Sequence, residues 1–193
     1  MSVIAVLCGG LSSEREVSLR TGRAVADVLT RAGKQVRVVE LCRQSFLADI
    51  AALRGSVSFV FNALHGTWGE DGAVQAVLDA LGLPYNGSGP IASALAMHKH
   101  LAKEVVSAVG VPTPPWRTVE NLEQVDEAVR ILGLPVVVKA SSEGSTVGVY
   151  IAKTSPEAVE GFRRAQECGG AVIVEQFVSG PELTVPVIGD DTL

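Results

Sequence analysis

Short apolar runs alternate with helix-periodic segments along the first half of the chain. The run at 3–7 is continuously apolar, as expected for a strand buried on both faces. Apolar positions then recur at helical spacing from Val17 to Ala32, and Gly33 provides a C-terminal stop. Further strands are predicted at 35–41, 57–64 and 83–85, with helices at 45–53 and 71–81. This alternation predicts a parallel sheet with helices packed on its faces.

The pattern changes after Pro90, which opens a predicted helix that runs to about Ala108. The V-P-T-P-P-W stretch at 111–116 cannot be helical, because its prolines lack a backbone donor and fix φ. A second domain is predicted to follow, with helices at 122–132 and 156–168 and strands at 136–139, 147–152, 171–177 and 182–188. A short Ser/Gly loop joins the first two of these strands, which favours a hairpin over a crossover.

The fold class predicted from these patterns is α/β. A Rossmann-like open parallel-sheet domain at 1–90 precedes a partial α+β domain at 91–181. Residues 182–193 are predicted to begin a C-terminal subdomain. The strand predicted at 182–188 would leave an exposed edge if it were the last element of a domain. We therefore expect the sequence to be part of a longer one.

Composition and charge narrow the classes of function. Hydrophobic residues make up 47% of the chain and charged residues 19%, so a packed core is expected. The net charge is −5 and basic residues are dispersed, which argues against a nucleic-acid partner. No apolar stretch approaches the roughly 20 residues needed to cross a bilayer, so no membrane contact is expected. The three cysteines are far apart and the start has no basic leader, which together favour reduced thiols and the cytoplasm.

The loop that follows Lys139 is the first candidate site. In V-V-V-K-A-S-S-E-G-S-T-V-G-V, at 136–149, a buried strand ends in a cation and leads into glycines and serines. Glycines let backbone N–H groups turn toward a phosphate, serines add hydroxyl donors, and lysine adds a point charge. An ordinary hairpin with an edge lysine explains this stretch alone equally well. The lysine precedes the glycines, so the stretch is not a Walker A loop.

The segment G-G-L-S-S-E-R-E-V-S, at 9–18, follows the first strand, where ligands bind in open α/β sheets. Ser13 and Glu16 fit a capping box at the start of a helix. Glu14 would then lie in the first turn, where the helix dipole favours an anion in any case. Glu40, at the end of the second strand, would suit a dinucleotide site, but the full G-x-G-x-x-G fingerprint is missing.

Three other segments carry candidate chemistry. The loop A-L-H-G-T-W-G-E-D-G, at 63–72, is hard to explain as core, so His65 is a candidate for ligand contact or for ordering the loop. Lys99 lies in the helix predicted after Pro90, where it would ordinarily be solvated. In V-I-V-E-Q-F-V-S-G-P-E-L-T-V, at 172–185, Glu175 and Glu182 place two carboxylates near one edge, which suits ribose hydroxyls.

Taken together, these segments resemble the D-alanine–D-alanine ligase family of the ATP-grasp superfamily. Six motifs occur in the order of the family and span almost the whole chain. They are G-G-L-S-S-E-R-E-V-S, A-L-H-G-T-W-G-E-D-G, G-S-G-P-I-A-S-A-L-A-M-H-K, L-P-V-V-V-K, E-G-S-T-V-G and S-G-P-E-L-T-V. The resemblance implies a pre-ATP-grasp domain followed by part of an ATP-grasp domain. It also implies ATP-dependent joining of two D-alanines through an acyl phosphate, for peptidoglycan precursor synthesis.

The resemblance also implies roles for particular residues. Glu14 would hold the ammonium of the first substrate, oriented by Ser145 as the second catalytic residue, and His65 would lie near the substrate carboxylate. The residues implied in ATP binding are Lys99, Lys139, Ser142, Glu143, Gly144, Ser145, Glu175, Gln176, Phe177, Val178 and Glu182. Within this group the 142–148 loop would form a lid. A homodimer through the N-terminal domain is expected.

Two departures from the family pattern are visible. The usual M-D-K and V-K-P become Met97-His98-Lys99 and Lys139-Ala140, and both lysines are retained. Family members are also longer, so the ligands of Mg²⁺ or Mn²⁺ are expected beyond residue 193 and none within this chain. We therefore expect that the chain does not catalyse alone. A D-alanine–D-lactate ligase, another ATP-grasp ligase, a non-catalytic nucleotide-binding module and a Rossmann-type oxidoreductase are the alternatives.

Overall fold

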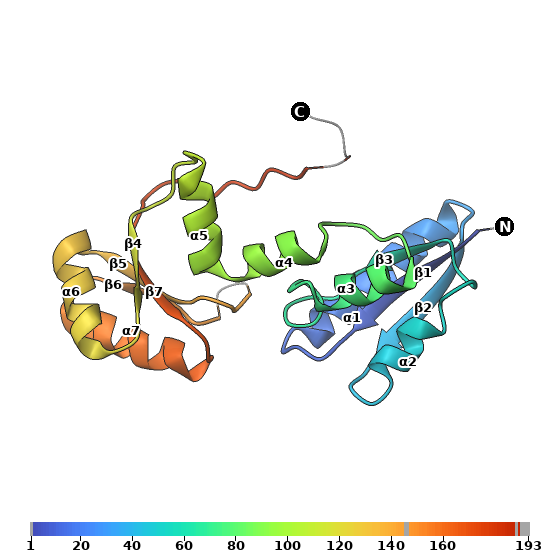
Figure 1. Cartoon of the computed structure of the whole chain (residues 1–193), viewed down its shortest axis with the longest axis horizontal. Helices are drawn as coiled ribbons and strands as arrows, with labels where there is room; N and C mark the ends of the chain where they lie inside the picture. Colours follow the sequence, from blue (N-terminus) through green and yellow to red (C-terminus); the bar gives the residue numbers. More distant parts are fainter. Residues whose placement is uncertain (1, 145–146, 188, 190–193) are drawn as a thin grey trace.

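The computed structural model describes residues 2–144, 147–187 and 189. Its first half is a three-stranded parallel sheet of order β2-β1-β3 (Figure 1). The central strand β1 (Val3–Gly9) pairs with β2 (Gln35–Leu41) on one side and with β3 (Phe59–Asn62) on the other. The predicted parallel sheet is therefore confirmed, although the strand predicted at 83–85 is reduced to a single bridge between Tyr85 and Val60.

Helices cover both faces of this sheet, because the side chains of β1 alternate between two cores. Val6 packs toward α1 (Arg15–Arg31). Ala5 and Leu7 pack on the opposite face, in a core shared with α2 (Phe46–Ala51) and α3 (Ala73–Leu81). The carboxyl ends of the three strands consequently meet at one edge, between the two helical layers.

The predicted helix from Pro90 to Ala108 is in fact two helices, α4 (Pro90–Met97) and α5 (Lys99–Ala108). The backbone turns at His98, with φ −89° and ψ 91°. The N–H of Lys99 leaves the helical ladder there and donates to the carbonyl of Ser141 at 3.0 Å. A tertiary hydrogen bond thus replaces a helical one and breaks the helix. In Figure 1, α4 lies between the two sheets and α5 runs beside β4.

The second sheet is antiparallel, with the order β4-β7-β5-β6. Its strands are β4 (Trp116–Val119), β7 (Val172–Gln176), β5 (Val136–Ala140) and β6 (Val149–Ala152). Helices α6 (Leu122–Leu132) and α7 (Ser155–Glu167) cover one face and enclose a core with Val136, Val138 and Val174. The hairpin of β5 and β6 confirms the sequence prediction. Strand β4 was not predicted.

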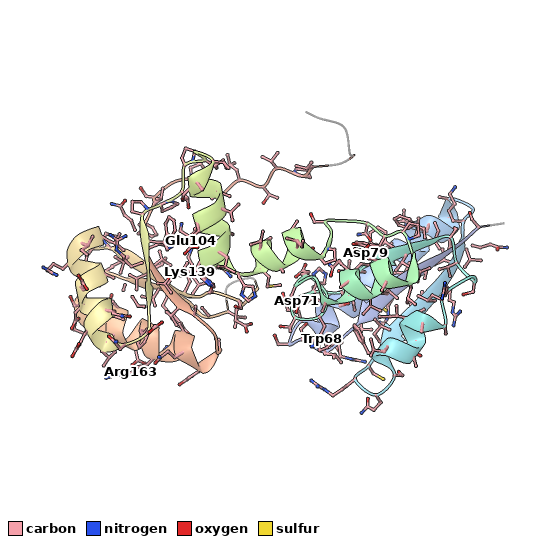
Figure 2. All side chains as sticks on the ribbon, viewed as in Figure 1. Trp68, Asp71, Asp79, Glu104, Lys139 and Arg163 are labelled. Carbon is pink, nitrogen blue, oxygen red and sulfur yellow. The ribbon has the colours of Figure 1, made fainter. Side chains whose placement is uncertain are left out.

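The opposite face of this sheet carries the charged side chains. Along β5, Val136 and Val138 point into the core, so Val137 and Lys139 point away from α6 and α7. Glu175 lies directly across from Val137, which makes it the diagonal neighbour of Lys139 on the same face. Figure 2 shows Lys139 at the base of α5. This face of the sheet, and not the Ser/Gly loop alone, therefore positions the predicted lysine.

Two local predictions were wrong. Ser13 and Glu16 do not form a capping box, because the N-cap of α1 is Glu14 and its side chain makes no capping hydrogen bond. The segment 182–188 was expected to be a strand, but 181–187 has no regular structure, since no strand in the described part of the chain pairs with it. No described helix is long and apolar enough to cross a membrane.

Candidate functional site

A cavity of about 400 Å³ lies between α5 and the exposed face of the second sheet. Three ammonium groups and one carboxylate line it, because Lys99 and Lys103 are four residues apart on α5 and share a helical face. The sheet contributes Lys139 and Glu175. The full lining is Ala96, Lys99, Ala102, Lys103, Pro114, Lys139, Ile173 and Glu175.

Glu175 is 7% exposed and forms ion pairs with two lysines. Its Oε1 contacts the ammonium of Lys139, and its Oε2 lies 3.1 Å from Nζ of Lys103. A buried carboxylate must be paired in this way, because an isolated charge in the interior is costly. With three cations around one anion, the cavity keeps a positive excess.

Lys99 lines this cavity with a half-buried side chain. Burial lowers the pKa of its ammonium, and the nearby charge of Lys139 lowers it further, while Glu143 and Glu175 act in the opposite direction. Its Nζ donates to the carbonyl of Glu143, in the loop that follows β5. An anion placed between Lys99 and Lys139 would relieve their repulsion.

A seam of polar contacts joins the α4–α5 break to the loop after β5; we define it as residues 98–100 and 141–143. Nδ1 of His98 lies 2.9 Å from Oγ of Ser142, and Nδ1 of His100 lies 2.6 Å from Oγ of Ser141. Ser141 is fully buried, and its carbonyl accepts from the N–H of Lys99. The seam fixes the beginning of the predicted lid against α5.

A second cavity, of about 320 Å³, lies where this loop meets the first half of the chain. Its lining is Leu11, Ser12, Ser13, Glu14, Arg43, Gly66, Thr67, Trp68, Ser142, Glu143 and Gly144. The carboxylate of Glu14 is held between two glycines. A Cβ atom added to Gly66 or to Gly144 would stand 2.9 Å from Oε2 of Glu14. The absence of side chains at both positions therefore makes room for this carboxylate.

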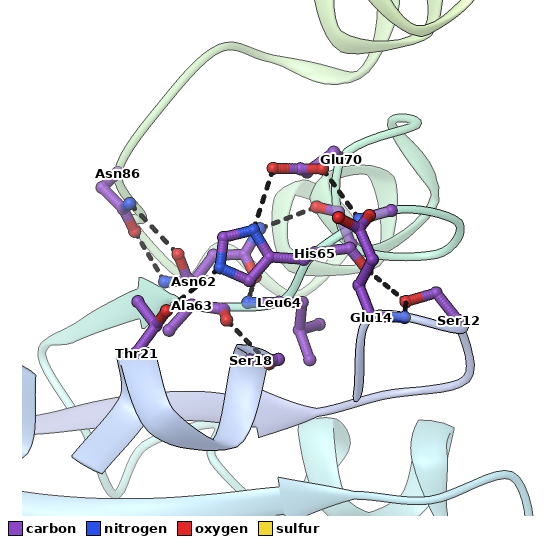
Figure 3. A network of polar contacts seen from close by, with 12 residues as sticks. Ser12, Glu14, Ser18, Thr21, Asn62, Ala63, Leu64, His65, Glu70 and Asn86 are labelled. Atoms are coloured by element: carbon purple, nitrogen blue, oxygen red, sulfur yellow. Dashed lines mark hydrogen bonds and ion pairs between the residues drawn. The ribbon is translucent and has the colours of Figure 1, made fainter. Parts of the chain in front are cut away.

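The loop that carries His65 is ordered by its own hydrogen bonds (Figure 3). Nε2 of His65 lies 3.2 Å from Oγ1 of Thr21, and Nδ1 lies 3.4 Å from Oε1 of Glu70. The other oxygen of Glu70 accepts from the N–H of Gly66 at 2.7 Å. Ser12 Oγ donates to the His65 carbonyl at 2.6 Å, which ties this loop to the segment that carries Glu14. His65 therefore orders the loop, as one of its two predicted roles requires.

The structure brings most of the predicted site residues together. Lys99, Lys139 and Glu175 line the first cavity, and Glu14, Ser142, Glu143 and Gly144 line the second. Other predicted residues lie apart. The N–H groups of Gln176 and Phe177 donate to the carbonyls of Pro115 and Pro135, and the side chains of Val178 and Glu182 are exposed. Ser145 lies outside the described residues.

Sequence reasoning missed Lys103, Ser141 and Arg43. Lys103 had a usable signal, because it follows Lys99 by one helical turn and must face the same way. Ser141 could only be found through its tertiary partners in the seam. Arg43 follows β2 and reaches the Glu14 cavity through the arrangement of the sheet edge.

The arrangement suits anion binding beside a carboxylate that can hold an ammonium group. Lysine ammoniums next to backbone N–H donors can stabilise charge on a phosphoryl group. A carboxylate such as Glu14 forms charge-assisted hydrogen bonds with an ammonium. Among residues 2–144, 147–187 and 189, no group of three or more His, Cys, Asp or Glu side chains could hold a metal ion. The described residues therefore do not fit a metal centre.

The chain is similar to known proteins of one family. The family model described as "D-ala D-ala ligase N-terminus" matches residues 42–88, and the one described as "D-ala D-ala ligase C-terminus" matches residues 105–193. The chain is 45% identical over 192 residues to the D-alanine–D-alanine ligase of Desulforudis audaxviator, covering 97% of this chain and 61% of that protein. It is 40% identical over 193 residues to the ligase of Carboxydothermus hydrogenoformans, with the same two coverages.

Solved structures show the same similarity. D-alanyl-alanine synthetase A from Vibrio cholerae superposes with a TM-score of 0.82 at 28% identity, covering 92% of this chain and 60% of that one. D-alanine–D-alanine ligase from Bacillus anthracis, complexed with ATP, superposes with a TM-score of 0.79 at 31% identity, covering 93% and 60%. The chain thus has the fold of the matching part of these ATP-grasp enzymes and spans about 60% of the length of the relatives it matches.

Proposed function

This chain belongs to the D-alanine–D-alanine ligase family, and on that premise we propose that its two cavities are the nucleotide and amino-acid sites of an ATP-dependent D-alanine ligase. One observation carries the proposal. The segment 142–144 contacts Lys99 of the lysine cavity through the carbonyl of Glu143 and lines the second cavity together with Glu14. A phosphate donor and an amino-acid acceptor would therefore meet across a single short segment.

In the proposed reaction, a carboxylate oxygen of the first D-alanine attacks the γ-phosphorus of ATP and ADP leaves. The amine of the second D-alanine then attacks the carbonyl of the acyl phosphate, and inorganic phosphate leaves as the amide bond forms. Lys99 and Lys139 would bind the phosphates and oppose the charge on the transferred group. Glu14 would hold the ammonium of the first D-alanine, and the 142–148 loop would exclude water.

For the remaining predicted residues, we propose the roles that the family resemblance implies. Glu175, the backbone of 176–178 and Glu182 would contact the adenosine part of ATP, and His65 would order the loop near the substrate carboxylate. ATP use is supported by the ATP complex of the Bacillus anthracis relative, whose fold this chain shares. The described residues contain no group of side chains that could hold a metal ion, so no step is assigned to Mg²⁺ or Mn²⁺. The names of the relatives favour D-alanine as the second substrate over D-lactate.

Titration calorimetry with a non-hydrolysable ATP analogue and with D-alanine tests the two sites separately. Replacing Lys139 with Met should weaken nucleotide binding by about tenfold or more, because a charge-assisted contact contributes roughly 1.5–3 kcal/mol. Glu14→Gln should weaken D-alanine binding and leave the nucleotide affinity unchanged.

Lys153→Met is the matched control, because Lys153 is an exposed lysine of the same half of the chain that lines neither cavity. The proposal fails if Lys139→Met and Lys153→Met bind the analogue equally well. Sedimentation of the same preparation tests the expected homodimer.

A further inference from the structure

Lys103 is a nearly buried lysine to which the proposed reaction gives no role. Its exposed fraction is 8%, and its ammonium is surrounded by three partners. Nζ donates to Oγ1 of Thr113 at 2.6 Å, lies 3.1 Å from Oε2 of Glu175, and stands 4.9 Å from the centre of the Trp116 ring. An ammonium is costly to bury without such contacts, so these three partners hold the side chain of Lys103 in one place.

The two lysines that pair with Glu175 differ in what else they touch. The side chain of Lys139 is 24% exposed and its charge acts on Lys99, whereas the side chain of Lys103 is 11% exposed and also contacts Thr113 and Trp116. Trp116 lies directly across the β4–β7 ladder from Glu175, which closes this side of the carboxylate. Lys139 is therefore the partner that can leave Glu175, and Lys103 is the partner that stays.

We propose that Lys103 is a positioning residue that keeps a counter-ion beside Glu175 and holds this carboxylate in place when a nucleotide phosphate draws Lys139 away from it. This inference rests on the proposed function, since it needs the phosphate to bind at Lys139. The charged groups that face Glu175 are Lys103 and Lys99 from α5 and Lys139 from β5. With Lys103 present, the carboxylate retains a buried counter-ion throughout binding.

Removal of Lys103 changes the proton balance of nucleotide binding. In the free Lys103→Met variant, Lys139 still pairs with Glu175. When the phosphate takes Lys139, Glu175 is left buried without its remaining direct ion-pair partner, and the carboxylate binds a proton supplied by the buffer. We expect proton uptake that exceeds the wild-type value and approaches one proton per nucleotide bound. Affinity should also fall about tenfold, because the charge-assisted contact that orients Glu175 is lost.

Calorimetric titration with the non-hydrolysable ATP analogue at pH 7, in PIPES and in Tris, measures this uptake, because the two buffers differ in ionisation enthalpy. Lys103→Arg keeps a charge at the position and should restore the wild-type proton count. Lys153→Met, which removes an exposed lysine, should also match wild type. A purely structural role for Lys103 would lower affinity or stability but would not add a proton to the binding reaction.

The inference is overturned if Lys103→Met, shown to be folded by circular dichroism, takes up no more protons than wild type. A wild-type chain that binds no nucleotide overturns the proposed function and this inference together. If Lys103→Met does not fold, the ¹⁵N NMR signals of the lysine ammonium groups in the wild type provide the test of the inference. Addition of the analogue should then shift the Lys139 signal and leave that of Lys103 in place, and a shift of both would contradict the inference.

Discussion

At the scale of the residue, Lys99 carries a pH dependence that can be measured. Burial, and then the charge of Lys139, lowers its pKa below the ordinary value of a lysine, about 10.4. A bound phosphate stabilises the charged form and so raises this pKa again. Nucleotide affinity should therefore be constant below the lowered pKa and fall as pH rises through it, because binding then requires uptake of a proton.

Titration calorimetry with the ATP analogue between about pH 7 and 10 follows this decline. Lys99→Arg should bind with a flatter profile, because a guanidinium stays charged over the whole range. Superimposable profiles for the variant and wild type would show that Lys99 does not cause the dependence.

The second prediction at the residue scale concerns Gly144. In Gly144→Ala the new Cβ would stand 2.9 Å from Oε2 of Glu14, which is the end of a flexible side chain. We expect the carboxylate to move aside, so that D-alanine affinity falls about tenfold while the free energy of unfolding changes little. Calorimetry with D-alanine and urea unfolding measure the two quantities.

Gly89→Ala is the control for this substitution. Its Cβ would lie 3.9 Å from the hydroxyl of Tyr85, an ordinary contact, and its φ of −70° suits alanine. Equal loss of D-alanine affinity in both variants would contradict the explanation.

At the scale of the element, helix α1 packs closely against strand β1 at Gly22. A Cβ at Gly22 would lie 2.5 Å from Cβ of Cys8, an atom that cannot rotate away. Helix propensity alone predicts that Gly22→Ala stabilises the chain by up to about 1 kcal/mol. Overpacking predicts the opposite sign, a loss of roughly 1–3 kcal/mol, and we expect it to dominate. Urea unfolding followed by circular dichroism determines the sign, and a stabilised variant would refute this packing.

The sequence correctly predicted the elements that are determined by the pattern of neighbouring residues. Periodic apolar positions gave the bounds of β2 and α6 and the hairpin of β5 and β6. The break at His98 depends on the carbonyl of Ser141, which is distant in sequence. The apolar periodicity therefore predicted one continuous helix across it. Strand β4 follows a proline-rich segment and is recognisable only by its pairing with β7. The capping box failed for a local reason, because α1 begins one residue later than predicted, with Glu14 and not Ser13 as its N-cap.

In the candidate site, too, features set by local sequence were predicted and those set by tertiary contacts were not. Glu14, Lys99 and Lys139 were found because each lies in a motif that resembles the family, and Glu175 was found because its segment places two carboxylates near one edge. The pairing of Lys139 with Glu175 was not predicted, because it depends on the register of two strands.

At the scale of the whole molecule, the two sheets have separate hydrophobic cores. The division predicted after residue 90 can be tested, because each half contains one tryptophan, Trp68 in the first and Trp116 in the second. We expect the two halves to unfold in separate transitions. An ATP analogue at about 100 times its dissociation constant should add about 2.7 kcal/mol to the half that contains the lysine cavity.

Thermal unfolding followed by fluorescence measures each half separately in single-tryptophan variants. Trp68→Phe leaves Trp116 as the reporter, and Trp116→Phe leaves Trp68. Addition of the analogue should raise the midpoint reported by Trp116 more than that reported by Trp68. A single shared transition that shifts equally in both variants would show that the chain unfolds as one cooperative unit.

The placement of Glu14 between two glycines has an evolutionary consequence. Gly66 and Gly144 are 78 positions apart, yet each leaves room for the same carboxylate oxygen. Gly66 must be glycine in any case, because its φ is 67°, whereas selection on Gly144 depends on the acid at position 14. Among homologues, a side chain at 144 should be found mainly where that acid has been shortened or lost, and positions 14 and 144 should change together.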